Sequence, residues 1–281
     1  MLMSFAVIGL VNHLSRGLDE SLETEKRFRA HLLLESAYTL ATHPDIDRGD
    51  PLLRQAVSSN SSYEVTLSTE GVRLAINELG TSPVQRRFAQ RLFEKWRLDT
   101  LQAQTLSESI ADWIDTDDRP RPHGAEKDHY TARGQLDFPF NRPFQNIGDL
   151  MLVRGADELS RRRPNWRDFF TLYGDGTIDM RLASGEMLEA LFDVSPAEVG
   201  RFVRARVGSD GLPDTEDDWR FASLPEVRRL LDVPETNYQA VVALLTLRHP
   251  IQRIECLAHA GRMERRLTVL SGSGLKLVHE E

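Results

Sequence analysis

Acidic side chains concentrate in one stretch of this chain, ADWIDTDDRPRPHGAEKDHY at positions 111–130. The carboxylates of this stretch belong to Asp112, Asp115, Asp117, Asp118, Glu126 and Asp128. Oxygen ligands at alternate positions followed by a glutamate suit Ca²⁺. A hydrolase could use such carboxylates as acid and base, and a solvated loop could neutralise them with Arg119, Arg121 and Lys127. The residue types alone leave a calcium loop, a catalytic cluster and a solvated loop open.

A helix is predicted immediately before these carboxylates. Its apolar positions recur at helical spacing: Leu106, Ile110, Trp113 and Ile114. The helix therefore ends near Asp115, where its dipole favours cations and disfavours a group of anions. Asp115, Asp117 and Glu126 match the first, third and twelfth places of an EF-hand loop. Arg119 and Pro120 stand where that loop needs an oxygen ligand and a glycine, so the stretch is no EF-hand and a looser calcium loop is retained.

A second acidic stretch, GSDGLPDTEDDWRF, lies at positions 208–221. Its carboxylates belong to Asp210, Asp214, Glu216, Asp217 and Asp218. An acidic surface turn is the favoured interpretation, with a second ion site as the alternative. His123 and His129 flank Glu126 and could join a metal site, although solvent-facing histidines are more common. The chain contains no phosphate-binding loop, zinc-helix motif or nucleophile elbow, so no catalytic residue is predicted.

The composition is that of an ordered globular protein, with 40% hydrophobic and 28% charged residues. A chain of 281 residues allows one to about three domains. The net charge of −8 argues against a nucleic-acid surface, because such surfaces depend on clustered lysine and arginine. The single cysteine, Cys256, cannot form an internal disulfide.

The amino-terminal stretch MLMSFAVIGLV is almost entirely apolar. The residues predicted to anchor the chain in a membrane are Phe5, Ala6, Val7, Ile8, Leu10 and Val11. A bilayer span needs about 20 apolar residues, so this run is too short to cross a membrane alone. A helical apolar stripe continues beyond it and no proline occurs before Pro44, which predicts one helix of about 40 residues. Such a helix is either the remainder of a membrane anchor or a long helix that a partner covers.

Strand-like alternation brackets a helical block. The alternating apolar residues of 63–76 predict a β-hairpin. Serine caps at Ser82, Ser195 and Ser223 begin predicted helices. The block over 100–248 contains about seven short helical segments without strand-like alternation. Three alternating runs at the carboxy terminus predict an antiparallel meander.

These elements predict an α+β fold, in which a long amino-terminal helix packs on an antiparallel sheet that carries an inserted all-α domain. The inserted short helices resemble SAM-like or helix-hairpin-helix-like units. The predicted boundaries are 1–44 for the helix, 45–99 for the first part of the α/β domain, 100–248 for the insertion and 249–281 for the strands that complete the sheet.

Three linked sets of motifs resemble those of a known family: WIDTDDRP with GAEKDHY, NRPFQNIGDL and YGDGTID. The residues in register with the family pattern are Trp113, Ile114, Asp115, Asp117, Pro120, Gly124, Ala125, Glu126, Tyr130, Asn141, Pro143, Phe144, Ile147 and Leu150, followed by Tyr173 to Gly176 and Ile178. Most closely over residues 100–195, the chain is similar to the minor pseudopilin K family of bacterial type II secretion systems.

The resemblance implies a pilin-like fold and a non-enzymatic subunit at the tip of the pseudopilus, which supports its assembly and the export of folded proteins across the outer membrane. The expected partners are the minor pseudopilins I and J, with H as a further candidate, and no nucleic acid. The helix is expected at the inner membrane of a Gram-negative bacterium and the globular part in the periplasm. The resemblance also implies calcium, with ligands Asp115, Asp117, Asp118 and Glu126; Asp128 and the stretch 210–218 are weaker candidates.

The chain departs from the family in two places. Pseudopilins begin with a basic leader and a hydrophobic segment of about 20 residues, and the leader and about half of that segment are missing here, which predicts a shortened amino terminus or a misassigned start. The family's I-N-x-N-T-A reads IDMRLA at 178–183, so no role of those asparagines is carried over. An alternative function is a helix-hairpin-helix-type module that binds nucleic acid or protein, suggested by the short helices of 146–155 and 184–207.

Overall fold

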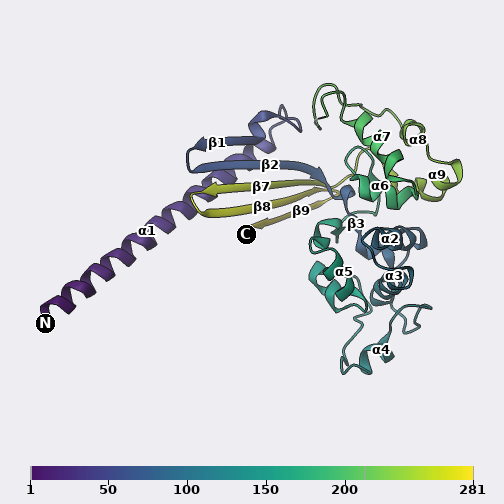
Figure 1. The fold of residues 1–281 in the computed structure, drawn as a ribbon, viewed down its shortest axis with the longest axis horizontal. Coiled ribbons are helices and arrows are strands. Elements are labelled where there is room, and N and C mark those ends of the chain that lie inside the picture. The colour runs from purple at the N-terminus through teal and green to yellow at the C-terminus, as the bar shows by residue number, and fades with distance from the viewer. Residues whose placement is uncertain (1, 212, 281) are drawn as a thin grey trace. The chain divides into compact units, whose positions relative to one another are not determined.

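The computed structural model describes residues 2–211 and 213–280, with side chains described from residue 22 onward. The chain folds into two compact units. The first, called the sheet unit here, comprises Met1–Ser68 and Gln252–Glu281, and the second, called the helical unit, comprises Thr69–Ile251. In chain order the helical unit is therefore an insertion between the two parts of the sheet unit (Figure 1).

The sheet unit begins with helix α1 (Leu2–Ala41) and the 3₁₀ helix η1 (Pro51–Leu53). Its strands are β1 (Arg54–Ser58), β2 (Ser61–Thr69), β7 (Gln252–Ala260), β8 (Met263–Gly272) and β9 (Leu275–Glu280). They form a five-stranded sheet in the order β1-β2-β7-β8-β9. β1 pairs antiparallel with β2, and β7, β8 and β9 form the predicted antiparallel meander.

Helix α1 packs on β7 and β8 through one apolar face. Ala30, Leu34 and Ala37 recur at helical spacing and are buried, so they line that face. The strand side chains that meet this face alternate, as in Cys256 and Ala258, because successive residues of a strand point to opposite sides. The predicted α+β fold, with a long helix on an antiparallel sheet, is confirmed.

The amino-terminal part of α1 carries the predicted membrane anchor. The side chains of Phe5, Ala6, Val7, Ile8, Leu10 and Val11 lie outside the described residues. Within the described part of the chain, no helix combines the length and the apolar character of a bilayer span.

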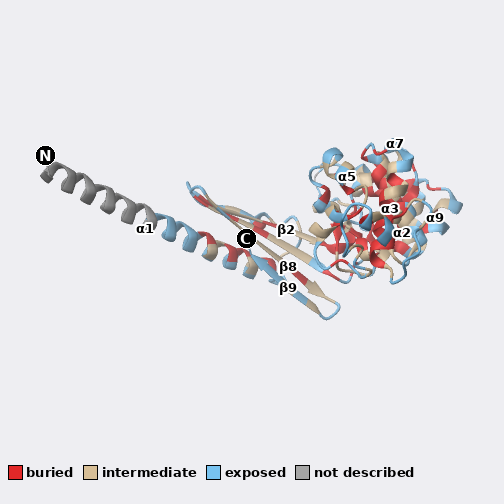
Figure 2. Ribbon diagram, turned by 90° about the horizontal axis from the view of Figure 1, so that it is seen from below, coloured by how far each residue is buried: buried red, intermediate tan, exposed pale blue. Residues whose placement is uncertain are grey.

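The helical unit contains eight α-helices among the described residues. They are α2 (Pro83–Lys95), α3 (Thr100–Ile114), α4 (Lys127–Thr131), α5 (Ala156–Arg162), α6 (Gly185–Phe192), α7 (Pro196–Arg206), α8 (Leu224–Leu231) and α9 (Glu235–Val241). The 3₁₀ helices are η2 (Glu70–Val72), η3 (Ile76–Leu79), η4 (Ile147–Leu152), η5 (Trp166–Phe169) and η6 (Val242–Leu244). Buried side chains of these elements form one continuous apolar core. Figure 2 colours the buried residues of the helical unit red.

Serine caps begin several of these helices, as predicted. The Ser82 side chain accepts a hydrogen bond from the Gln85 backbone and begins α2. Ser195 and Glu198 form a reciprocal capping box at the start of α7. Ser223 also precedes a helix, but its side chain makes no capping hydrogen bond. Polar residues that satisfy the first free N–H groups therefore set two of these three starts.

The predicted hairpin over 63–76 is wrong. The hairpin formed by β1 and β2 spans Arg54–Thr69, and Glu70–Val72 continues as 3₁₀ helix η2. Leu74–Ala75 forms strand β3, which pairs in parallel with β4 (Phe170–Thr171). The alternation predicted that residues 63–67 pair with residues 72–76. Strand β3 is buried and pairs instead with β4, which lies far along the chain, and alternation does not specify such a partner.

The insertion is also larger than predicted, and it contains strands. It begins at Thr69 rather than at residue 100, so α2 belongs to the helical unit. Strand-like segments do occur within 100–248: the two-residue strands β5 (Ile178–Asp179) and β6 (Leu245–Thr246) pair in parallel. Strands this short are fixed by long-range pairing and leave almost no periodic signal.

Candidate metal centre

Helix α3 places the first two carboxylates of the site. Asp99 and Gln102 form a capping box at its start, so the register of the helix is set from the amino-terminal end. Asp112 lies in the last turn, and Asp115 is the carboxy-terminal cap, where the backbone leaves the helix in an extended conformation. Residues three apart share one face of a helix, so both carboxylates project to the same side.

The third carboxylate comes from the start of helix α4. Glu126 is the N-cap residue of α4 and is only 4% exposed. Asp112, Asp115 and Glu126 each offer one oxygen atom, and these oxygens all lie within 4.8 Å of one another. The Asp112 residue is fully buried, with an exposed fraction of 0%. The loop between α3 and α4 thus folds back to gather three carboxylates below the surface.

Arg121, within that loop, is the cation nearest to two of these carboxylates. Its Nη1 atom donates to Asp112 Oδ1 at 2.5 Å and to Asp115 Oδ2 at 2.5 Å. Its backbone N–H donates to Asp112 Oδ2 at 3.2 Å. Its Nη2 atom donates to the Gly80 carbonyl at 3.4 Å. The guanidinium therefore partly neutralises two anions at the negative end of α3.

Several oxygens of the site have no hydrogen-bond partner. Both carboxylate oxygens of Glu126 and Oδ1 of Asp115 are buried and unpaired. Burial, together with repulsion from Asp112 and Asp115, raises the pKa of Glu126 to about 8. Burial also raises the pKa of Asp112, against the hydrogen bonds from Arg121. Unpaired buried polar atoms are costly, so these oxygens fit a hard cation that they could share.

Gly124 makes room for the buried carboxylate of Asp112. A Cβ atom at this position would lie 1.8 Å from Asp112 Oδ2, which is far inside contact distance. Any side chain here would displace the carboxylate or the loop. The glycine of the GAEKDHY motif is therefore required by the close approach of the loop to Asp112.

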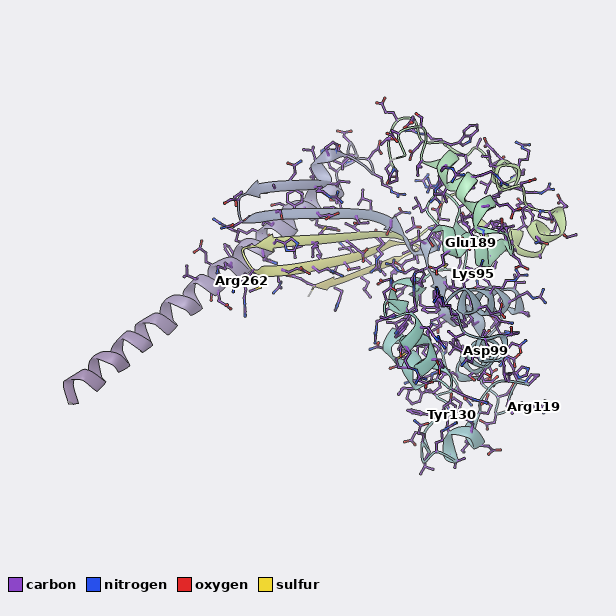
Figure 3. All side chains as sticks on the ribbon, in the orientation of Figure 1. Lys95, Asp99, Arg119, Tyr130, Glu189 and Arg262 are labelled. Carbon is purple, nitrogen blue, oxygen red and sulfur yellow. The ribbon has the colours of Figure 1, made fainter. Side chains whose placement is uncertain are left out.

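Aromatic packing holds the loops around the site. The rings around Trp113 belong to Tyr130, Phe138, Phe140 and Phe144, at centroid distances from 5.1 to 6.0 Å. The Tyr130 hydroxyl accepts a hydrogen bond from the Arg154 backbone at 3.2 Å, and Arg154 Nη1 donates to the Gly124 carbonyl at 2.9 Å. Figure 3 shows Tyr130 and Arg119 at the end of the helical unit that carries α4. Residues outside the acidic stretch thus fix the loop that supplies Glu126.

The structure brings together only part of the predicted ligand set. Asp115 and Glu126 meet in the site, whereas Asp117 and Asp118 are exposed in the loop. Asp117 accepts a hydrogen bond from the Arg119 backbone at 2.9 Å, and Asp118 accepts one from the Asn141 amide at 3.1 Å. These bonds shape the exposed part of the loop.

The sequence prediction omitted Asp112, the most buried carboxylate of the group. Its spacing of three from Asp115 on the same helix is the signal that could have identified it. His123 and His129 are not among the described residues that could ligate an ion together with Glu126. His123 instead donates its backbone N–H to Glu108 Oε2 at 2.7 Å, and the His129 ring lies 3.0 Å from Arg133 Nη1.

The second acidic stretch is satisfied by its own loop. Oδ2 of Asp217 accepts hydrogen bonds from the backbone and hydroxyl of Ser209 and from the backbone of Asp210. The Thr215 hydroxyl donates to Oδ1 of Asp217 at 2.7 Å. The hydrogen bond from Thr215, followed by those from Ser209, holds the pKa of Asp217 well below its usual range. The described carboxylates of this stretch form a hydrogen-bonded turn rather than a group of unpaired buried oxygens.

The fold belongs to a class already seen in a solved secretion protein. A chain in the crystal structure of the GspK-GspI-GspJ complex from the type 2 secretion system of enterotoxigenic Escherichia coli matches with a TM-score of 0.64 and 16% sequence identity. The match covers 96% of this chain and 98% of that one. The class is therefore an α+β protein with a long amino-terminal helix, an antiparallel sheet and an inserted helical unit.

Sequence comparisons match part of the chain to a known family. Residues 71–164 match the family model described as type II secretion system (T2SS), protein K. The chain is 29% identical over 115 residues to type II secretion system protein K of Pseudomonas aeruginosa, covering 41% of this chain and 34% of that protein. It is 32% identical over 94 residues to the protein of the same name from Klebsiella pneumoniae, covering 32% of this chain and 29% of that protein.

Over residues 71–164 the chain matches the type II secretion system protein K family, so the resemblance that its motifs predicted is confirmed for this part of the chain. The matched segments span about a third of the length of these two curated relatives. Residues 71–164 contain the whole candidate metal centre, since they include α3, its loop and α4.

Proposed function

We propose that the chain is a structural, non-enzymatic minor pseudopilin that stands at the tip of a type II secretion pseudopilus and supports its assembly and protein export. The observation that carries the proposal is the exposed apolar face of α1. Phe28 and Leu32 are 62% and 44% exposed, although both are large apolar side chains. Their spacing of four places them together, on the side of the helix away from Ala30 and Leu34.

The partners proposed for this face are the long helices of the minor pseudopilins I and J, with H as a further candidate. A solved complex of K, I and J from Escherichia coli supports the choice, because one of its chains shares this fold. Packing of apolar stripes between long helices would remove Phe28 and Leu32 from water. The helix would lie at the inner membrane of a Gram-negative bacterium and the globular part in the periplasm.

A pair of matched variants tests the helix interface. Replacement of Phe28 and Leu32 by serine removes apolar surface without adding charge, and the sheet-facing side of α1 stays intact. We expect a loss of at least about tenfold in affinity for the I–J pair, because two large apolar side chains contribute about 1.5–3 kcal/mol each when fully buried. Glu23→Ser with Arg27→Ser is the control, since both side chains are exposed, lie on the other side of the helix from Phe28 and Leu32, and together leave the net charge unchanged. Unchanged binding of the Phe28 and Leu32 variant would contradict the proposed interface.

The bulk of the helical unit supports the proposed place at the tip, because a subunit with a large insertion can end a helical filament but cannot continue it. The Glu70 backbone N–H donates to the Ile251 carbonyl at 3.0 Å, so the chain enters and leaves the helical unit at one point. Residues 70–251 can therefore be replaced by a short turn. We expect this variant to retain the sheet by circular dichroism and to abolish tip assembly; normal secretion would contradict the capping role.

We also propose that the site formed by Asp112, Asp115 and Glu126 holds Ca²⁺. The support is the burial of these carboxylates, the unpaired oxygens of Asp115 and Glu126, and the hard-ligand chemistry of all three groups. A bound cation would join the end of α3 to the start of α4. Calcium would therefore act as a structural link within the helical unit.

Calcium titration followed by thermal unfolding tests this site. The wild-type protein should gain stability with added Ca²⁺, because a ligand that binds only the folded state stabilises it. Glu126→Gln should lose most of this gain, whereas Asp117→Asn, at an exposed position in the same loop, should keep it. Tb³⁺ luminescence sensitised by Trp113, which follows Asp112 in the chain, gives an independent signal of binding. An equal calcium response in the Glu126 variant would contradict the assignment of the ligands.

A further inference from the structure

Arg121 occupies the position between Asp112 and Asp115 that a cation would take. Its Nη1 atom lies 2.5 Å from Asp112 Oδ1 and 2.5 Å from Asp115 Oδ2. Protein oxygens lie about 2.3–2.6 Å from a bound Ca²⁺. The Arg121 Nη1 atom therefore lies as far from Asp112 Oδ1 and Asp115 Oδ2 as a calcium ion bound to both oxygens would lie.

The loop holds this guanidinium in place from several sides. The Arg121 backbone N–H donates to the same carboxylate of Asp112, at 3.2 Å, and Nη2 reaches the Gly80 carbonyl at 3.4 Å. The side chain is only 24% exposed, so water screens its two ion pairs weakly. Arg121 is thus a counter-ion for Asp112 and Asp115, and it lies in the loop between α3 and α4 that supplies the proposed calcium site.

The arginine neutralises the site only in part. The three gathered carboxylates carry three negative charges when ionised, and one guanidinium offsets one of them. Both oxygens of Glu126 and Oδ1 of Asp115 stay without a partner while Nη1 is in place. A divalent ion could contact all three carboxylates at once, which the planar guanidinium does not do.

We propose that Arg121 competes with Ca²⁺ for Asp112 and Asp115 and thereby sets the calcium affinity of the site. Without calcium, Nη1 bridges the two aspartates and keeps α3 and its loop together. Asp112, Asp115 and Glu126 would hold the ion once Nη1 has left this position. The inference rests on the proposed calcium site and adds to it a residue that weakens binding while stabilising the calcium-free protein.

If Arg121 orients the aspartates instead of competing with calcium, its removal should change the calcium affinity in the opposite direction. If the arginine only oriented the two aspartates for the ion, its removal would loosen the carboxylates and weaken calcium binding. If it competes, its removal leaves three close carboxylates without their bridging guanidinium and tightens binding. The sign of the change in calcium affinity therefore distinguishes the two roles.

Arg121→Gln in the full chain is the decisive variant. We expect its dissociation constant for Ca²⁺, measured by isothermal titration calorimetry, to fall at least tenfold below that of the wild type. Its unfolding temperature in a calcium chelator should fall, and excess Ca²⁺ should restore it. Arg119→Gln changes the same charge two residues away, at an exposed position, and should alter the dissociation constant by less than about twofold. Unchanged or weaker calcium binding by Arg121→Gln would overturn the competition.

A milder variant covers the case in which Arg121→Gln does not fold without calcium. Arg121→Lys keeps the charge but loses the planar fork, so its calcium affinity should lie between those of the wild type and of Arg121→Gln. Affinity equal to or below the wild type in Arg121→Lys would count against competition. If neither the wild type nor either variant binds Ca²⁺, the calcium site itself is rejected; if the wild type binds and the variants bind no more tightly, only the competition is rejected.

Discussion

The two acidic stretches of the helical unit are similar in sequence and differ in structure. Both lie between helices and both adjoin a tryptophan. In the first, Asp112 and Glu126 are buried and the Glu126 oxygens lack partners. In the second, Asp217 is exposed and accepts hydrogen bonds from Ser209, Asp210 and Thr215. A high density of carboxylates thus indicates an ion site only where burial removes water and the loop supplies too few donors.

The largest difference should follow from removing one carboxylate in each stretch. Asp112→Ala removes two charge-assisted hydrogen bonds from Arg121, which keeps only Asp115 as a carboxylate partner, and it should cost about 3 kcal/mol of unfolding free energy. The unfolding temperature of the helical unit should then fall by roughly 10 °C, as measured by calorimetry in a calcium chelator. Asp217→Ala should cause a much smaller fall, because water can replace the lost hydrogen bonds. Equal effects of the two variants would remove the distinction between the stretches.

Glycine replacements probe the shape of each loop. In Gly124→Ala the new Cβ atom would lie 1.8 Å from Asp112 Oδ2, so we expect a loss of about 1–3 kcal/mol in unfolding free energy and weaker calcium binding. Gly211→Ala in the second stretch meets no atom within 4 Å, and only its positive φ of 71° opposes the change. Its loss should be about 1 kcal/mol, with no change in calcium binding. Urea unfolding and calorimetry measure both quantities.

The two stretches should respond to pH in opposite directions. The pKa of Glu126 is raised from 4.5 to about 8, so its neutral form stabilises the calcium-free fold below pH 4.5 and this contribution is lost as the pH rises through about 8. The pKa of Asp217 is lowered from 3.8, so its contribution is present above that pH and is lost in acid.

Unfolding temperatures measured from pH 3 to pH 9 in a chelator would show both effects. Glu126→Gln should abolish the loss of stability between about pH 4.5 and pH 8, and Asp217→Asn should reduce the loss in acid. A loss between these pH values that persists in Glu126→Gln would contradict the titration assigned to this residue.

The smallest effect is expected at the surface of the first stretch. Asp118 is exposed and its side chain accepts one hydrogen bond, from Asn141. Asp118→Ala should therefore change the unfolding free energy by about 0.5 kcal/mol or less and leave calcium affinity unchanged. A loss of calcium binding in this variant would contradict the site formed by Asp112, Asp115 and Glu126. It would favour the predicted ligand set that includes Asp118.

Local sequence patterns predicted much of the fold. The helical stripe of α1, the caps at Ser82 and Ser195 and the alternation in β7 to β9 reflect periodicities of a single element. The hairpin over 63–76 failed because alternation does not specify a partner. Strand β3 is buried, and its pairing with Phe170–Thr171 depends on residues almost a hundred positions away.

The amino-acid sequence by itself determined the resemblance to the protein K family, the α+β order of elements and the existence of an acidic stretch at the end of α3. Only the tertiary structure decided which carboxylates meet. Asp112 enters the site because it shares a helix face with Asp115, and Glu126 enters because aromatic packing around Trp113 and the bond from Arg154 to Gly124 close the loop. Periodicity records which face of an element is buried, whereas a site between loops depends on long-range contacts that no local pattern contains.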